Sequence, residues 1–130
     1  MASASADRTV LDILGNVEAI LGVNKNPTFG HVMMLGTGGI LAEIFDDVSF
    51  RTVNISTSDV SEMIMETSLG RFVEGFRGIR INEKSIVDTV ISLSQLIQDE
   101  GGNIRSLDIN PLILTESDAF AVDAKIVLSK

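Results

Sequence analysis

Alternating apolar and polar residues predict strands over much of the first half of the chain. Val17–Val23 is a short apolar segment that reads as a strand, although a helix over residues 9–21, weakened by Gly15, remains an alternative. His31–Leu35 is continuously apolar, which favours burial on both faces of a sheet. Val48–Ile55 alternates with a period of two, as a half-buried strand does. Together with a further strand at Ile40–Phe45, these segments predict an antiparallel meander, with turns at residues 24–27 and 46–47.

A first helix is predicted after the meander. Ser56 and Asp59 have the spacing of a capping box, in which the hydroxyl accepts an amide hydrogen bond and the carboxylate reaches back. We expect this helix to run to about Ser68, before Gly70 stops it.

A second helix is predicted between Asn82, which can cap it, and the stop signal Asp99–Gly102. Its apolar residues recur at helical spacing and are expected to face the core: Ile86, Val87, Val90, Ile91, Leu93, Leu96 and Ile97. Strands, two helices and a final hairpin, in that order, predict an α+β fold with a mostly antiparallel sheet covered by two or three helices.

The final hairpin carries a group of oxygen-bearing side chains. Its first strand is expected to place Leu107, Ile109 and Pro111 on one face and Asp108, Asn110 and Leu112 on the other. Turn formers at Thr115–Asp118 would bring a second strand, Phe120–Leu128, back alongside, so that Asp123 approaches Asp108 and Asn110. Two or three converging oxygen ligands suit Mg²⁺, which completes its shell with water and phosphate. The alternative is that these three residues form the solvent-facing side of an ordinary half-exposed hairpin and bind no metal.

Composition narrows the class of protein. The 130 residues suit one domain, 45% of them are hydrophobic, and the formal net charge is −8. This charge argues against nucleic acid and anionic membrane as partners. The chain has no cysteine, which excludes disulfides and thiolate chemistry. No apolar run is long enough for a membrane span, and no signal peptide is apparent, so the expected location is cytoplasmic. Residues 1–8 are small and polar and predict a flexible terminus before a single subdomain over residues 9–130.

Two further segments offer weaker site candidates. Gly36–Gly39 could let backbone amides approach an anion, or could form a tight turn before a strand at Ile40–Phe45, and it lacks the lysine of a P-loop. The irregular segment Glu74–Arg80 carries Arg77 and Arg80, which could grip a phosphate or could simply be solvated.

Several motifs occur in a fixed order: Glu18–Val23 with Asn26–Gly30, Gly36–Glu43 with Asp47–Arg51, Gly75–Gly78, Leu107–Leu112 and Val122–Leu128. In this order they resemble the C-terminal part of the ATP-grasp domain of ADP-forming acyl-CoA synthetases. These enzymes are of the acetate–CoA ligase type and are related to succinyl-CoA synthetase beta subunits. The resemblance covers nearly the whole chain and makes the metal-binding interpretation of the hairpin the favoured one.

The resemblance implies roles for particular residues. Asn110 and Asp123 would hold the Mg²⁺ that bridges ATP or ADP phosphates, and Asp108, a glutamate in the succinyl-CoA relative, would face a phosphohistidine as the catalytic carboxylate. Lys125 would share their face and touch phosphate or pair with a carboxylate. Five more residues match family positions on the cofactor-binding side: Gly38, Gly39, Glu43, Arg51 and Arg77.

The chain also departs from the family pattern. His31 stands where the family often has proline and is not carried over as the phosphohistidine. The resemblance implies a missing ATP-grasp lobe that would complete the nucleotide site. It also implies partner domains or a subunit that bind CoA and carry the phosphohistidine, so we expect a fragment of a larger synthetase. The alternatives are a regulatory module, as in acetyltransferase fusions, or a structural domain that forms a homo-oligomer.

Overall fold

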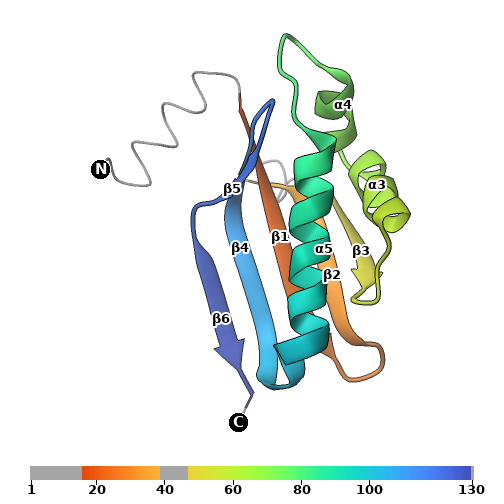
Figure 1. Ribbon diagram of the computed structural model, residues 1–130, viewed down its shortest axis with the longest axis vertical. Helices are drawn as coiled ribbons and strands as arrows, with labels where there is room; N and C mark the ends of the chain where they lie inside the picture. Colours follow the sequence, from red (N-terminus) through yellow and green to blue (C-terminus); the bar gives the residue numbers. More distant parts are fainter. Residues whose placement is uncertain (1–15, 39–46, 130) are drawn as a thin grey trace.

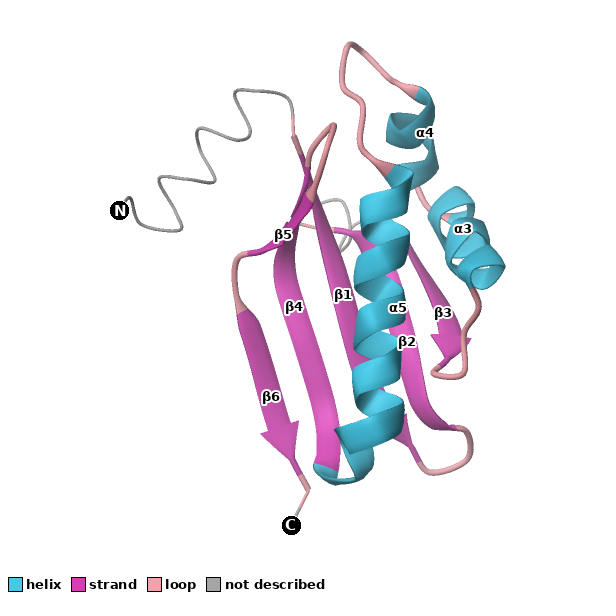
Figure 2. Ribbon diagram, viewed as in Figure 1, coloured by secondary structure: helices cyan, strands magenta, loops and turns pink. Residues whose placement is uncertain are grey.

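Six strands form a single antiparallel sheet in the computed structural model, which describes residues 16–38 and 47–129. The strand order is β3-β2-β1-β4-β5, and β6 also pairs with β4 (Figures 1 and 2). The bounds are β1 Val17–Asn26, β2 Gly30–Thr37, β3 Val48–Thr52, β4 Ile104–Leu114, β5 Ala119–Ala121 and β6 Ala124–Leu128. All strand pairs are antiparallel, which confirms the predicted α+β class with a mostly antiparallel sheet.

The helices within residues 16–38 and 47–129 lie on one face of this sheet (Figure 1). They are α3 (Thr57–Glu66), α4 (Leu69–Glu74) and α5 (Glu83–Glu100), followed by a single 3₁₀ turn, η1 (Gly101–Asn103). The long helix α5 runs lengthwise along the strands over the middle of the sheet, while α3 and α4 lie on the side of β3 (Figure 2). None of the helices in the part of the chain that the structure describes has the length and apolar character that a membrane crossing requires.

The hydrophobic core fills the space between the sheet and the helices. Alternate residues of the strands point into it, because successive side chains of a strand leave opposite faces. Burial of each valine, leucine, isoleucine or methionine side chain contributes about 1.5–3 kcal/mol. The core includes Ala19, Leu21, Val23, Met33 and Leu35 from the strands and Val60, Met63, Ile86, Val90, Leu93 and Ile97 from the helices.

The first helix begins as its sequence predicts but ends differently. Asp59 N–H donates to Ser56 Oγ at 3.1 Å and Ser56 N–H donates to Asp59 Oδ2 at 2.9 Å, which confirms the capping box. The helix ends at Glu66 because Thr67 is extended, and its hydroxyl donates to the Ile64 carbonyl. Gly70 therefore does not stop this helix but lies inside α4, and the prediction was wrong on that point.

The second predicted helix is confirmed as α5. Asn82 Oδ1 accepts the N–H of Ser85 at 2.7 Å, and the helix ends before Gly101. The apolar stripe is narrower than predicted, because Leu96 is 46% exposed and lies outside the core.

The first two strands also differ in detail from the prediction. Val17–Leu21 is strand and not helix, and β1 continues to Asn26, so the predicted turn begins three residues too early. In β2, Val32 and Met34 are only partly buried, because the described helices cover only the other face of the sheet. Burial on both faces was therefore overestimated.

Two further strand predictions remain. The strand that begins at Val48 ends at Thr52 and not at Ile55. The strand predicted at residues 40–45, like the flexible terminus at residues 1–8, lies outside the described residues.

Candidate functional site

An irregularity in the longest strand shapes the site. Leu21 pairs with Ile109 and Ala19 pairs with Leu112, so Asn110 and Pro111 of β4 together face the single residue Ile20 of β1. This is a β-bulge, with the Asn110–Pro111 peptide bond in the cis form. Proline is tolerated at a bulge because no ladder hydrogen bond is needed from its nitrogen.

The bulge reverses which residues face the core. Leu107, before the bulge, and Leu112, after it, both belong to the helix-side core, although five positions separate them. The sequence predicted that Leu112 shares the face of Asp108 and Asn110, and this was wrong. The bulge inserts the extra residue that shifts the alternation, so Leu112 is fully buried while Asp108 and Asn110 are exposed.

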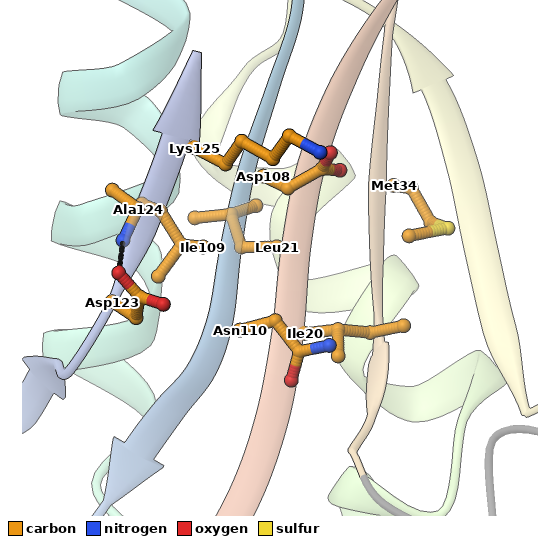
Figure 3. Close-up of a pocket in the computed structure, with 9 residues that line it drawn as sticks. All are labelled: Ile20, Leu21, Met34, Asp108, Ile109, Asn110, Asp123, Ala124 and Lys125. Atoms are coloured by element: carbon orange, nitrogen blue, oxygen red, sulfur yellow. Dashed lines mark hydrogen bonds between the residues drawn. The ribbon is translucent and has the colours of Figure 1, made fainter. Parts of the chain in front are cut away.

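Four of the predicted site residues line one shallow pocket on the face opposite the helices. Asp108 and Asn110 come from β4, Asp123 comes from the two-residue link between β5 and β6, and Lys125 comes from β6 (Figure 3). The pocket has a volume of about 300 Å³. Its remaining lining is mostly apolar: Ile20, Leu21, Met34, Ile109 and Ala124.

Main-chain hydrogen bonds hold the link between β5 and β6 against the bulge. The N–H of Asn110 donates to the carbonyl oxygen of Asp123 at 3.2 Å, and the N–H of Val122 donates to that of Pro111 at 3.1 Å. The N–H of Ala124 donates to Asp123 Oδ1 at 3.0 Å, which orients the carboxylate (Figure 3). Asp123 is thus brought beside Asn110 by the backbone of both segments.

Asp108 and Lys125 are Cα partners in the β4–β6 pairing. Because directly opposite residues of an antiparallel pair share a face, their side chains extend to the same side, as Figure 3 shows. Gly22 of β1 is the partner of Asp108 on the other side. The carboxylate therefore stands between a cationic side chain and a position without a side chain.

The other predicted site residues that the structure describes lie outside this pocket. Gly38 follows β2 and donates its N–H to the carbonyl of Glu18 at 2.9 Å. Arg77 lies in the exposed loop after α4, with its guanidinium carbon 5.3 Å from the centre of the Phe76 ring. Gly39 and Glu43 lie outside the described residues.

Arg51, on β3, is engaged on the helix side of the sheet. Its guanidinium group donates to both carboxylate oxygens of Glu66, at 2.7 and 3.0 Å, and approaches Glu62 at 3.4 Å. Ser49 Oγ also donates to Glu66. The hydrogen bonds from Arg51 and then Ser49 lower the pKa of the Glu66 carboxyl to about 2, and Glu66 raises the pKa of Arg51. This network ties β3 to α3.

Sequence reasoning did not find this network or the apolar lining of the pocket. Ser49 and Glu66 are seventeen residues apart in sequence, and no local sequence pattern predicts their contact. Ile20 and Met34 reach the pocket only through the register of three strands. The one usable signal was the alternation within β3, which places Ser49 and Arg51 on a common face.

The donor set of the pocket fits a hard divalent cation. The Asp123 carboxylate and the Asn110 amide oxygen match the one or two carboxylate-type ligands that Mg²⁺ takes from a protein, with water and phosphate completing the shell. Within residues 16–38 and 47–129, no group of three or more histidine, cysteine, aspartate or glutamate side chains is placed to hold a metal ion.

A model of the ATP-grasp domain matches residues 7–128. The chain belongs to the ATP-grasp domain family. Its similarity to the ATP-grasp region of ADP-forming acyl-CoA ligases is also confirmed. It is 38% identical over 114 residues to the beta subunit of the ADP-forming acetate–CoA ligase II of Pyrococcus furiosus, covering 85% of this chain and 48% of that one. It is 34% identical to the ADP-forming acetate–CoA ligase II of Archaeoglobus fulgidus, covering 88% of this chain and 17% of that protein.

Solved structures agree with this family. The dinucleotide-forming acetyl-coenzyme A synthetase 1 of Candidatus Korarchaeum cryptofilum superposes with a TM-score of 0.80 at 37% identity, over 86% of this chain and 53% of that one. That structure is a complex with coenzyme A and Mg-AMPPCP, with its phosphohistidine segment pointing towards the nucleotide-binding site. The chain thus spans about half, or less, of the length of these three relatives.

Proposed function

We propose that the chain supplies the metal-binding half of the nucleotide site in an ADP-forming acyl-CoA synthetase. Such an enzyme would convert acyl-CoA, ADP and phosphate to acid, ATP and CoA through a phosphohistidine. The observation that carries the proposal is the single pocket shared by Asp108, Asn110, Asp123 and Lys125. Membership of the ATP-grasp family and the Mg-AMPPCP in a related structure support it.

Asn110 and Asp123 are the residues that would hold Mg²⁺. Their side-chain oxygen atoms are hard ligands on an exposed face of the sheet. The main-chain hydrogen bond between the two residues keeps both in place before any ligand binds. When bound, Mg²⁺ offsets the negative charge of the nucleotide and of the transferred phosphoryl group.

Asp108 would face the histidine that carries the phosphoryl group. A carboxylate that accepts a hydrogen bond from one ring nitrogen orients the imidazole and stabilises its charged form. Lys125, directly across β4–β6, would neutralise phosphate oxygens on the same side of the pocket.

The pocket is open on one side, and this chain spans only about half of its subunit-length relatives. A second lobe would close over the open face, because a shallow hollow of about 300 Å³ cannot enclose a nucleotide. Partner domains or a partner subunit would bring coenzyme A and the phosphohistidine segment.

The test compares two pairs of variants in the complete synthetase that carries this domain. Asn110→Ala and Asp123→Ala should each abolish Mg²⁺-dependent phosphoryl transfer to ADP. The matched controls are Asn103→Ala and Asp118→Ala, which remove an amide and a carboxylate outside the pocket lining. Near-normal turnover in both pocket variants would refute the proposal.

A second readout does not depend on turnover. Mn²⁺ replaces Mg²⁺ at oxygen-rich sites, and its paramagnetism broadens nearby amide signals. When Mn²⁺ is added to this chain, the amide signals of Asn110 and Asp123 should broaden at lower Mn²⁺ concentration than other amide signals. In Asp123→Ala this difference should disappear. Uniform broadening over the acidic surface of the wild-type chain would contradict a site at the bulge.

A further inference from the structure

A single row of residues crosses the open face of the sheet through the pocket. The pairing registers place Lys125 opposite Asp108, Asp108 opposite Gly22, Gly22 opposite Met34 and Met34 opposite Phe50. Gly22 alone in this row has no side chain. It lies in the interior of β1, where glycine normally weakens a strand.

The backbone of Gly22 does not require glycine. The described glycines with positive φ are Gly30, Gly75 and Gly78, so Gly22 adopts a conformation open to any residue. The reason for glycine at this position must therefore lie in the space around it.

That space is occupied by the Asp108 carboxylate. A Cβ atom at Gly22 would lie 3.1 Å from Asp108 Oδ1, 3.5 Å from Met34 Cε and 3.6 Å from the Leu107 carbonyl oxygen. The first distance is tighter than ordinary contact, so the carboxylate would have to move by a few tenths of an ångström. The carboxylate lies against the backbone of β1, in the pocket that Asn110, Asp123 and Lys125 also line.

Gly36 provides a contrast on the neighbouring strand. A Cβ atom there would lie 2.5 Å from the backbone carbonyl oxygen of Asp47, so glycine at that position is needed for the fold itself. At Gly22 the closest atom instead belongs to the end of a side chain that lines the pocket. The two glycines therefore serve different purposes.

We infer that Gly22 is a positioning residue, whose missing side chain leaves the space in which the Asp108 carboxylate is held. What the placed carboxylate does in phosphoryl transfer rests on the proposed function, whereas the placement itself does not. A methyl group at position 22 should leave the fold intact and displace the carboxylate.

The first experiment examines placement in this chain. Carbon-13 NMR of the aspartate carboxyl groups is recorded for the wild type, Gly22→Ala and the control Gly102→Ala, whose Cβ would meet no atom within 4 Å. Gly22→Ala should shift the Asp108 carboxyl signal and leave the carboxyl signals of Asp88 and Asp118 in place, and Gly102→Ala should shift none of the three. An Asp108 signal that superposes on the wild type in Gly22→Ala overturns the inference.

If Gly22→Ala fails to fold, the double variant Gly22→Ala/Asp108→Ala decides. Removing the carboxylate removes the obstruction, so the double variant should recover a native amide spectrum. A double variant that stays unfolded shows that the methyl group conflicts with the backbone, as it would at Gly36, and the inference is then wrong.

The second experiment uses single-turnover phosphoryl transfer in the complete synthetase. Gly22→Ala should slow transfer by about tenfold, because small displacements of a catalytic group are costly. In the Asp108→Ala background the same change should alter the rate by less than about twofold, because the two residues act as one unit. Equal factors in both backgrounds would refute a role through Asp108. If Asp108→Ala itself keeps the wild-type rate, the proposed role of Asp108 fails, and the carbon-13 result still decides the placement.

Discussion

The backbone N–H of Asn110 donates to the carbonyl oxygen of Asp123 at 3.2 Å, so the two proposed magnesium ligands are joined through their main chains. The bond does not involve either side chain. Replacing either side chain therefore removes a metal ligand and leaves the main-chain hydrogen bond between β4 and the β5–β6 link in place. Loss of metal binding can thus be separated from loss of the fold. It also means that the protein, and not the metal, brings the two ligands together.

Lys125→Met tests whether the ammonium group contacts phosphate. Among the described residues Lys125 makes no ion pair, although Asp108 lies opposite it. Its charge is thus available to a ligand, and a lost charge-assisted hydrogen bond should raise the KM for ADP or phosphate about tenfold. Steady-state kinetics of the complete synthetase measure this. Lys84→Met, at an exposed position in the first turn of α5, should change neither KM, and a fall in kcat at constant KM would contradict phosphate contact.

Glu66 makes stability depend on pH in the acid range. Its folded pKa, about 2, lies below the ordinary value of 4.5 because Arg51 and Ser49 hydrogen-bond the charged form. The stabilisation is therefore fully present above about pH 5 and is lost as the pH falls toward 2. Thermal midpoints of the wild type should exceed those of Glu66→Gln at pH 7, and the two curves should converge near pH 2. Glu116→Gln, in the exposed turn, is the control, and parallel curves for Glu66→Gln and wild type would refute the effect.

Leu93 and Leu96 provide a matched pair on one helix. Leu93 is 7% exposed and belongs to the core, whereas Leu96 is 46% exposed. Leu93→Ala should lower the free energy of unfolding by about 2–5 kcal/mol, because it leaves a cavity against the sheet. Leu96→Ala should change it by at most about 0.5 kcal/mol. Urea denaturation gives both values, and similar losses in the two variants would contradict the orientation of α5.

Local patterns predicted the elements whose causes are local. The capping box at Ser56 and the cap at Asn82 lie within four residues of their partners, so spacing alone reveals them. The end of α3 was missed because Thr67 breaks the helix with its own hydroxyl, and Gly70 was the more obvious signal. The turn after β1 was placed too early, because Asn24 and Asn26 are turn formers by type but are held in the strand by pairing with β2.

The candidate site was predictable to the extent that it follows alternation along a strand. Asp108 and Asn110 share an exposed face, and Asp123 and Lys125 return to it on the hairpin. The place of Leu112 was not predictable, because a bulge changes the alternation without a mark in the hydrophobic pattern other than Pro111. The proximity of Gly22 to Asp108 depends on the register between strands that are distant in sequence.

Because of the bulge at Asn110 and Pro111, the number of residues in β4 is more strictly constrained than the residue types at its exposed positions. Exposed positions before it can change residue type without disturbing the core, because they touch only solvent or the pocket. A one-residue deletion at the bulge would instead restore strict alternation and turn Leu112 and Leu114 out of the core, or turn Asp108 and Asn110 into it. Related chains should therefore tolerate substitutions in this strand far more readily than single-residue insertions or deletions.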